Sequence, residues 1–514
     1  MTAAAAGVQL RRVARGGGLN LVGVGIATVA NLALTVCLTR LTDPVVAGTF
    51  FAGTSALLLF STVCRLGSNT GLVYFTAQAM GRSARPNLAR LLATSRTPVL
   101  AVTVGAALLL VIAGPSFADS LGWATSGRSL WVVFALALPP MVMHEVWLAV
   151  TRGLHRMGPT VVIARVGIPV GQLVLVGVAA QVGLGTIELL LAWCLPYLVA
   201  AVAAWLVRRT TMSHVSQTEQ SAAAEVTGRA YWRFTVPRAV ASVAQIGMAR
   251  LDILLVAALR GPTEAAIYVA ATRFVVVGQL ASQALGLSAQ PHIAGAAARG
   301  DGRALDELYR LTTCWLVLMT WPAYLVSAAV APELMQVFGD GYDNGVDVVL
   351  VMAAAMLVAT ASGMVDVFVN MAGRSSWTMI TAFAGLVTMV VVDLVLIGPL
   401  GSIGAAIGWA AAIVVRNGLS LAVLYRQVGM KPFRGPGLLA GAVSLVTLGP
   451  SIVVTYLDTP SGLRLMTLAA GVVCWLVAVG AARRRLGLDL MFHRAGTPGT
   501  RDSQPISTTD EVGR

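Results

Sequence analysis

Apolar runs of about 20 residues recur fourteen times along the chain and constrain its fold more than any other feature. Wound as a helix, a run of this length crosses about 30 Å of hydrocarbon, the core of a bilayer. Hydrophobic residues fill 57% of the 514 positions and charged residues 11%, whereas soluble domains carry about 25% charged residues. The sequence therefore predicts an all-α membrane protein with about fourteen transmembrane helices. The expected spans are 18–40, 45–66, 97–118, 129–150, 159–181, 185–207, 237–259, 263–287, 311–331, 346–370, 377–398, 402–425, 437–457 and 463–482.

The basic residues indicate how these helices are oriented. Most of them lie in alternate gaps between the apolar runs, and the opposite gaps hold only Arg40, Arg128, Arg260 and Arg464. Cytoplasmic loops of membrane proteins carry the excess of arginine and lysine. We therefore expect both termini in the cytoplasm, in agreement with an even number of spans.

Two halves of the sequence share a set of landmarks at one constant offset. Each landmark of the first half recurs 218 positions later, as from 44 to 262. The landmarks are Pro44, Arg85, Arg156, Gly183 and Arg208, with the counterparts Pro262, Arg303, Arg374, Gly401 and Arg426. Six helices per copy is an even number, so both copies enter the membrane from the same side. Transporters built from such parallel repeats place the substrate path between the two halves.

The repeat and the polar stretches together predict the domain organisation. A six-helix bundle at 1–208 is joined by a cytoplasmic linker at 209–228 to a second six-helix bundle at 229–426. Helices 13 and 14 follow at 427–482, outside the repeat. The remainder, 483–514, is rich in small and polar residues and is expected to be a disordered cytoplasmic tail.

Several functional classes are disfavoured by the composition. The net charge of +14 is spread over loops between apolar runs, whereas nucleic-acid binding needs basic residues clustered on a soluble face. The five cysteines are scattered within apolar runs without a CxxC pair, which argues against disulfides and metal sites. The single lysine, Lys431, leaves no GxxxxGK[ST] phosphate loop. We therefore expect no enzyme activity, catalytic residue, metal, cofactor or nucleic-acid partner.

Ionisable residues inside the apolar runs are the best clue to function. A charge at the bilayer centre costs about 2.5–3.5 kcal/mol, so it normally faces a cavity or a partner. At a rise of about 1.5 Å per residue, Arg250 and Arg273 fall near the midplane and Asp252 and Asp393 in the outer half. The charges expected nearer the cytoplasmic side are Arg65, Arg165, Arg416, Glu145 and Asp366.

Two interpretations of these arginines stay open. Arg273, with Arg65 and Arg165 below it, could bind an anionic headgroup such as a diphosphate through bidentate hydrogen bonds. Alternatively, Arg250 or Arg273 could form a structural ion pair with Asp252 or Asp393. Arg250 and Asp252 lie about 200° apart around a helix, which predicts that they do not face the same cavity.

The remaining candidates follow from helical position. Gln245 shares a helix face with Asp252, and Asn31 and Arg416 complete the set of cavity candidates. Asp252 and Asp393 lie at similar depths on two helices and form a candidate pair of acids for a coupling proton or sodium ion.

With these residues identified, the chain resembles the polysaccharide-exporter branch of the multidrug/oligosaccharidyl-lipid/polysaccharide (MOP) flippase superfamily. The resembling segments are RLDILLVAALRGPTEAAIYVAATR at 250–273, SQALGLSAQPHIAGAAARGD at 282–301, VFGDGY at 337–342, PLGSIGAAIGWA at 399–410 and RLGSNTGLVYF at 65–75. The resemblance covers about residues 18–426. It implies two bundles of the MATE type, forming a V around a central cavity that opens alternately to each side.

The implied cargo is an isoprenoid diphosphate-linked glycan, moved to the outer leaflet of the plasma membrane for cell-surface polysaccharide assembly. Candidate partners are membrane lipids and a glycan polymerase or glycosyltransferases. The two extra helices also resemble peptidoglycan-precursor (lipid II) flippases, but the first helix carries Asn20 and Asn31 and no arginine. It also lacks the acid that multidrug antiporters of the superfamily often carry there. These two transport functions and a non-transporting membrane scaffold for glycan assembly remain alternatives.

Overall fold

The computed structural model describes residues 3–81, 88–120, 127–216, 227–371, 375–428, 435–457 and 459–489. Every regular element within these ranges is a helix. The first half comprises α1 (Ala3–Leu41), α2 (Pro44–Cys64), α3 (Ser68–Gly81), α4 (Leu88–Ser120), α5 (Gly127–Gly153), the π-helix η2 (Thr160–Gly167), α6 (Ile168–Gln181) and α7 (Thr186–Ser216).

The second half is longer and more interrupted. It comprises α8 (Gly228–Arg260), α9 (Pro262–Thr272), the 3-10 helix η3 (Arg273–Val275), α10 (Val276–Ala298), α11 (Gly302–Ala329), α12 (Ala331–Gln336), η4 (Asp343–Gly345), α13 (Val346–Ala361), α14 (Val365–Met371), α15 (Ser375–Leu400), α16 (Ser402–Val423), the π-helix η5 (Leu424–Val428), α17 (Pro436–Thr455) and α18 (Ser461–Ala481).

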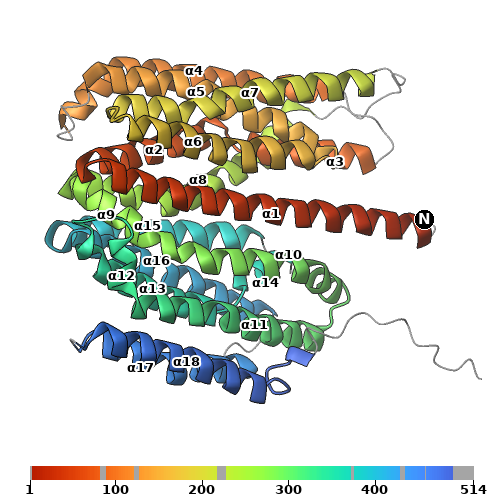
Figure 1. The fold of residues 1–514 in the computed structure, drawn as a ribbon. Coiled ribbons are helices and arrows are strands. Elements are labelled where there is room, and N and C mark those ends of the chain that lie inside the picture. Colours follow the sequence, from red (N-terminus) through yellow and green to blue (C-terminus); the bar gives the residue numbers. More distant parts are fainter. Residues whose placement is uncertain are drawn as a thin grey trace, which may run out of the picture.

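The helices run alongside one another as a slab, with α17 and α18 along one edge (Figure 1). Thirteen helices in the described part of the chain are long and apolar enough to cross a membrane. A fourteenth span is the pair Pro262–Val275 and Gly278–Gln290, bent by 41°. The prediction of an all-α membrane protein with about fourteen spans is confirmed.

Two of the pairs at the constant offset adopt matching local structures, whereas Arg85 and Arg374 of two other pairs lie outside the described residues. Pro44 and Pro262 each stand at the first turn of a helix, where a missing N–H costs nothing. Gly183 and Gly401 both have positive φ, +76° and +60°, in the turns before α7 and α16. The predicted linker at 209–228 is occupied by α7 as far as Ser216, and its next ten residues lie outside the described ranges, as do residues 490–514 of the predicted tail.

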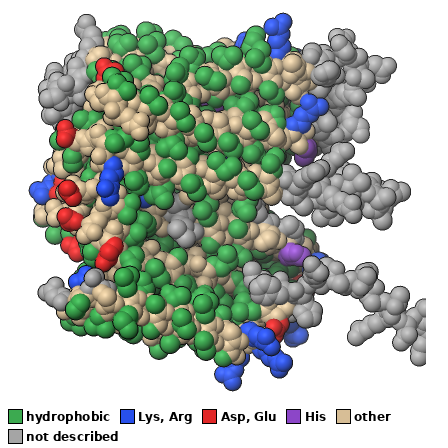
Figure 2. All heavy atoms as spheres, viewed as in Figure 1, with side chains coloured by type: hydrophobic (Ala, Val, Ile, Leu, Met, Phe, Trp, Pro, Cys, Tyr) green, Lys and Arg blue, Asp and Glu red, His purple; other side chains and the backbone are tan. Residues whose placement is uncertain are grey.

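Charge divides the two ends of the slab. We call the end that carries Leu41 and Pro44 the outer end, following the orientation predicted from the arginines. Figure 2 shows a largely hydrophobic middle, with acidic side chains gathered at the outer end and most basic ones at the opposite end. Exposed acids at the outer end include Glu333, Asp340 and Asp343. This distribution is that of a protein embedded in a bilayer across its middle.

The two halves are sealed together at the outer end. The Arg40 guanidinium donates hydrogen bonds from Nε to the Val337 carbonyl (2.8 Å) and from Nη2 to the Gln336 carbonyl (2.7 Å). Beside this clasp, α2 and α9 approach so closely that a Cβ added at Gly48 would overlap the Pro262 carbonyl. The seal therefore combines side-chain hydrogen bonds to main-chain carbonyls with a close approach of two helix backbones.

Candidate functional site: two adjoining cavities

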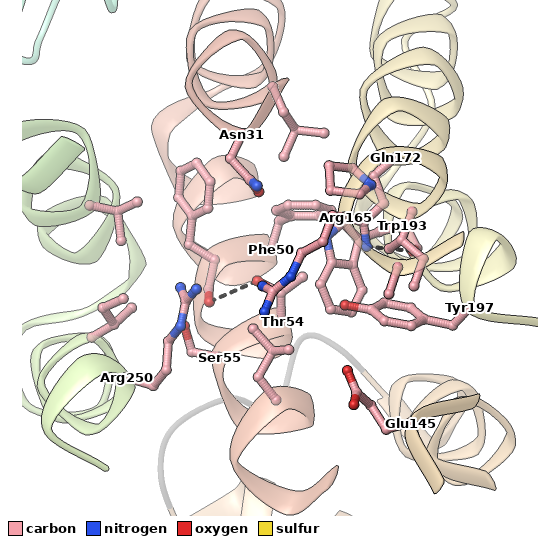
Figure 3. Close-up of a pocket in the computed structure, with 18 of the residues that line it drawn as sticks. Asn31, Phe50, Thr54, Ser55, Glu145, Arg165, Gln172, Trp193, Tyr197 and Arg250 are labelled. Carbon is pink, nitrogen blue, oxygen red and sulfur yellow. Dashed lines mark hydrogen bonds between the residues drawn. The ribbon is translucent and has the colours of Figure 1, made fainter. Parts of the chain in front are cut away.

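Two cavities adjoin each other, one between the halves and one within the second half, and Arg250, Ile253 and Arg273 line both. The smaller, of about 260 Å³, is lined by four arginines, and we call it the arginine cavity. They are Arg65 on the turn after α2, Arg165 in η2, Arg250 on α8 and Arg273 in η3. Figure 3 shows Arg165 and Arg250 reaching into this cavity from separate helices.

Three of these arginines stand where helix geometry is irregular. Arg65 is the C-cap of α2, followed by a turn in which Leu66 and Gly67 have positive φ. Arg165 belongs to a π-helix and Arg273 to a 3-10 helix. Such interruptions redirect side chains and commonly mark functional sites. They turn the guanidinium groups of three separate spans toward one space.

The break at Arg273 has an identifiable cause in the neighbouring helix. Tyr324 of α11 donates its hydroxyl proton to the Val275 carbonyl at 3.2 Å. Its ring occupies the space beside Gly278, where a Cβ would overlap the hydroxyl oxygen. A side chain that satisfies a helix carbonyl in place of the next turn bends the helix. Gly278 and Tyr324 thus place Arg273 at the bend.

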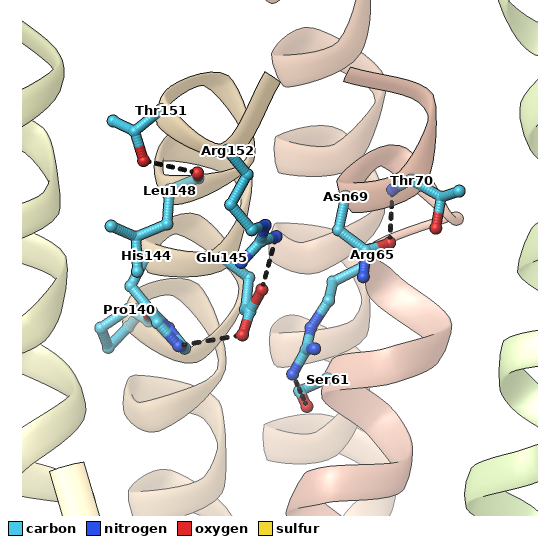
Figure 4. A network of polar contacts seen from close by, with 10 residues as sticks. All are labelled: Ser61, Arg65, Asn69, Thr70, Pro140, His144, Glu145, Leu148, Thr151 and Arg152. Atoms are coloured by element: carbon cyan, nitrogen blue, oxygen red, sulfur yellow. Dashed lines mark hydrogen bonds and ion pairs between the residues drawn. The ribbon is translucent and has the colours of Figure 1, made fainter. Parts of the chain in front are cut away.

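One carboxylate, Glu145, lines the arginine cavity, and it already has a partner. Arg152 donates to it from Nη2 at 3.0 Å, and His144 Nε2 lies 3.9 Å from its other oxygen (Figure 4). Arg65 instead donates to the Ser61 hydroxyl at 3.1 Å. The cavity therefore holds four guanidinium groups with no free carboxylate among its described lining residues.

The structural ion pairs that were an alternative for Arg250 and Arg273 are not seen. Among the described residues no carboxylate oxygen lies within 4.0 Å of either guanidinium, nor of Arg165. The Nε of Arg273 is buried and has no hydrogen-bond partner within the protein. An unpaired guanidinium is costly to bury. The cavity is consequently pre-arranged for an anion.

The larger cavity, of about 840 Å³, lies within the second half and is lined mainly by neutral polar and apolar groups. We call it the amide cavity, after Gln245 on α8, Gln279 and Gln283 on α10 and Asn417 on α16. Arg416 also lines it and is paired there with Asp366 of α14. The remaining charged groups of its lining are Asp252 and the shared Arg250 and Arg273.

The two acids predicted to bind a coupling cation have different surroundings. Asp252 lines the amide cavity and accepts hydrogen bonds from the Tyr268 hydroxyl (2.7 Å) and its neighbour's amide, Ile253 N (2.8 Å). Asp393 on α15 is fully buried, and neither carboxylate oxygen has a partner among the described residues. The two carboxylates interact electrostatically. The described residues contain no cluster of three or more metal-ligating side chains.

One sequence prediction about a pair of candidates is wrong. Arg250 and Asp252 both line the amide cavity, contrary to the prediction from their angular separation. The cavity extends around α8 and the arginine side chain is long, so helix angle alone does not separate the two groups. Gln245 shares the cavity with Asp252 as expected, and Asn31 lines the arginine cavity.

The sequence analysis missed Gln279, Gln283 and Asn417. Polar residues spaced i, i+4 within an apolar run would have indicated a polar helix face, and Asn417 adjoins Arg416. Trp193, Tyr197 and Gln172 also line the arginine cavity. Gln172 donates to the Trp193 carbonyl at 3.2 Å, a bond between helices α6 and α7.

The fold defines a multi-pass membrane protein. The structure is similar to the lipid II flippase MurJ in its inward closed conformation, with TM-score 0.70 and 10% identity over 92% of this chain and 99% of that one. An inward-facing multidrug resistance MATE family transporter gives TM-score 0.60 and 13% identity over 79% and 95%. A MOP superfamily transporter from Pyrococcus furiosus gives 0.51 and 14% over 85% and 96%.

At these identities the structural likeness shows the fold. The MatE family model matches residues 237–395, within the second half. No curated protein matches the chain in sequence. Together the MatE match and the shared fold support membership of the MOP superfamily, as the resemblance predicted. The polysaccharide-exporter branch is not distinguished by them.

Proposed function

We propose that the protein is a flippase that moves a lipid-linked oligosaccharide, an isoprenoid diphosphate glycan, from the cytoplasmic to the outer leaflet of the plasma membrane. The observation that carries the proposal is the arginine cavity, with four guanidinium groups and its one carboxylate already paired. A diphosphate offers several charged oxygens that guanidinium groups bind in bidentate fashion. The same charge opposes the cationic drugs of a multidrug exporter.

The arrangement of the seal supports transport by alternating access. Arg40 and the contact of α2 with α9 close the outer end, so the cavities in this state are separated from the outer side. A scaffold without transport activity would gain nothing from four arginines that line one cavity without a carboxylate partner. Both termini in the cytoplasm and no catalytic activity form part of this proposal.

A lipid II flippase is the second candidate function. The likeness to MurJ extends over 92% of this chain and 99% of that one, and the two extra helices of the sequence also resemble lipid II flippases. Lipid II carries the same diphosphate chemistry, so the arginine cavity fits both cargoes. The two cargoes differ in the headgroup that is attached to the diphosphate.

Depletion of the protein tests both functions. We expect an isoprenoid diphosphate that bears a glycan to accumulate on the cytoplasmic leaflet, as measured by mass spectrometry of extracted lipids and by glycan labelling of sealed vesicles. Accumulation of a peptide-bearing muropeptide lipid would favour the lipid II function. If no lipid diphosphate accumulates, the flippase proposal fails.

The buried acids are proposed to couple transport to a proton or sodium gradient. We expect Asp393→Asn to abolish the stimulation of transport by an imposed gradient in proteoliposomes, because the neutral amide no longer exchanges a cation or proton. Asp347→Asn, at an exposed acid of the outer end, is the matched control. Gradient-stimulated transport that is unchanged in Asp393→Asn would contradict a coupling role.

A further inference from the structure

The amide cavity has the chemistry of a site for neutral, hydroxyl-rich groups. Gln245, Gln279, Ser282 and Gln283 line it, and none of them makes a hydrogen bond to another described residue. Each primary amide both donates and accepts, which matches sugar hydroxyls, since these also do both. The ring of Trp409 lines the same cavity and offers an apolar face beside the amides.

The positions of these amides on three helices give the site a defined shape. Gln279 and Gln283 are four residues apart on α10 and therefore lie on one face of that helix. Gln245 faces them from α8, and Asn417 stands on α16, where its amide N–H bonds the Ala359 carbonyl at 3.3 Å and its carbonyl oxygen stays free. Three helices thus present unused hydrogen-bonding groups to one space of about 840 Å³.

The amide cavity differs from the arginine cavity in the charge of its lining. Asp366 and Arg416 neutralise each other, with the Ser420 hydroxyl donating to the second oxygen of Asp366 at 3.2 Å. Asp252 is held by Tyr268. The uncompensated cations, Arg250 and Arg273, stand at the boundary with the arginine cavity. An anionic ligand is therefore favoured on one side of this boundary and a neutral polar ligand on the other.

We propose that the amide cavity is the glycan site, which holds the neutral sugars of a lipid whose diphosphate occupies the arginine cavity. This inference rests on the proposed flippase function. The two shared arginines bind the phosphate nearest the sugar, so that one ligand spans both cavities. Selection of the glycan then depends on the second half of the protein, and capture of the diphosphate on both halves.

The test measures binding of two probes to the purified full-length protein in nanodiscs: undecaprenyl diphosphate alone, and undecaprenyl diphosphate bearing a neutral trisaccharide. The double variant Gln279→Leu/Gln283→Leu removes two amides at similar side-chain length. We expect it to lose about tenfold in affinity for the glycan-bearing lipid, with a much smaller change for the bare lipid. Gln181→Leu, at an exposed position near the outer end of α6, is the matched control.

The outcomes separate the two proposals. A double variant that binds both probes as the wild type does, or loses affinity for both equally, overturns the glycan site and leaves the flippase proposal standing. The wild type binding neither lipid overturns the flippase proposal itself. Gln245→Leu on α8 repeats the test from a different helix, in case the double variant does not fold. A third probe carries a peptide in place of the sugars. If the double variant weakens binding of that probe alone, the glycan site is overturned and the cavity is assigned to peptides.

Discussion

Arg273→Ala is expected to abolish transport while the protein remains at normal levels in the membrane. Arg273 has no carboxylate partner within 4.0 Å among the described residues, and its buried Nε is unpartnered. Its removal therefore leaves no acid uncompensated. It does remove charge-assisted hydrogen bonds to a diphosphate, which contribute about 1.5–3 kcal/mol each. Such a loss corresponds to about 10- to 100-fold weaker binding.

Complementation of a strain depleted of the protein measures this effect, with membrane levels of the protein determined in parallel. Arg273→Lys keeps the charge but loses the planar, bidentate donor set, so we expect partial activity. The control is Arg260→Ala, which removes an exposed guanidinium whose one bond is to the Gly398 carbonyl at 3.4 Å. Loss of the Arg273→Ala protein from the membrane would instead indicate a structural role, since breaking a buried ion pair costs about 3–5 kcal/mol.

Gly48→Ala is expected to block transport by a different route, by preventing closure of the outer end. A Cβ at this position would overlap the Pro262 carbonyl. Both clashing groups belong to helix backbones, so no side-chain rotation relieves the overlap and α2 must move away from α9. Overpacking of this kind costs about 1–3 kcal/mol. A conformational equilibrium that is finely balanced shifts by about 5- to 100-fold for that amount.

The opening is measured with Ser55→Cys, which places a thiol at a buried position lining the arginine cavity. We expect a membrane-impermeant maleimide added from outside to label this thiol faster when Gly48→Ala is present, after subtraction of labelling at the native cysteines. Gly105→Ala, where an added Cβ meets nothing within 4 Å, serves as the control. Normal transport with unchanged labelling would show that the α2–α9 contact is not needed for closure.

The length of the apolar runs predicted the spans well, because the thickness of the bilayer sets that length. The predicted and observed helices differ at their ends. The helices α4, α8 and α11 begin at Leu88, Gly228 and Gly302, about nine residues before the predicted spans. Each of these added segments carries arginines, such as Arg90, Arg229 and Arg303, and hydropathy does not detect a helix that continues into water. The break at Arg273 was likewise not predictable, since neither Phe274 nor Val275 breaks helices. Its cause is Tyr324, 49 residues further along the chain.

The candidate residues could be selected from the sequence, but their grouping in space could not be predicted. Insertion cost singled out Arg250 and Arg273, and the structure shows that Arg65 and Arg165 of the first half share their cavity. That grouping depends on how the halves face each other, which the spacing of residues along one helix does not contain. The glutamines of α10 were overlooked because neutral amides cost less to insert than charges and stand out less in an apolar run.

The hydrogen bonds of Arg40 across the two halves have a consequence for how the sequence of this protein diverges in evolution. The acceptors are the carbonyls of Gln336 and Val337, which every amino acid presents equally. Substitutions at 336 and 337 can therefore accumulate without a compensating change at Arg40. We expect the place where the halves meet to leave no record of paired substitutions, so methods that infer contacts from coevolving positions would overlook the closure of this transporter.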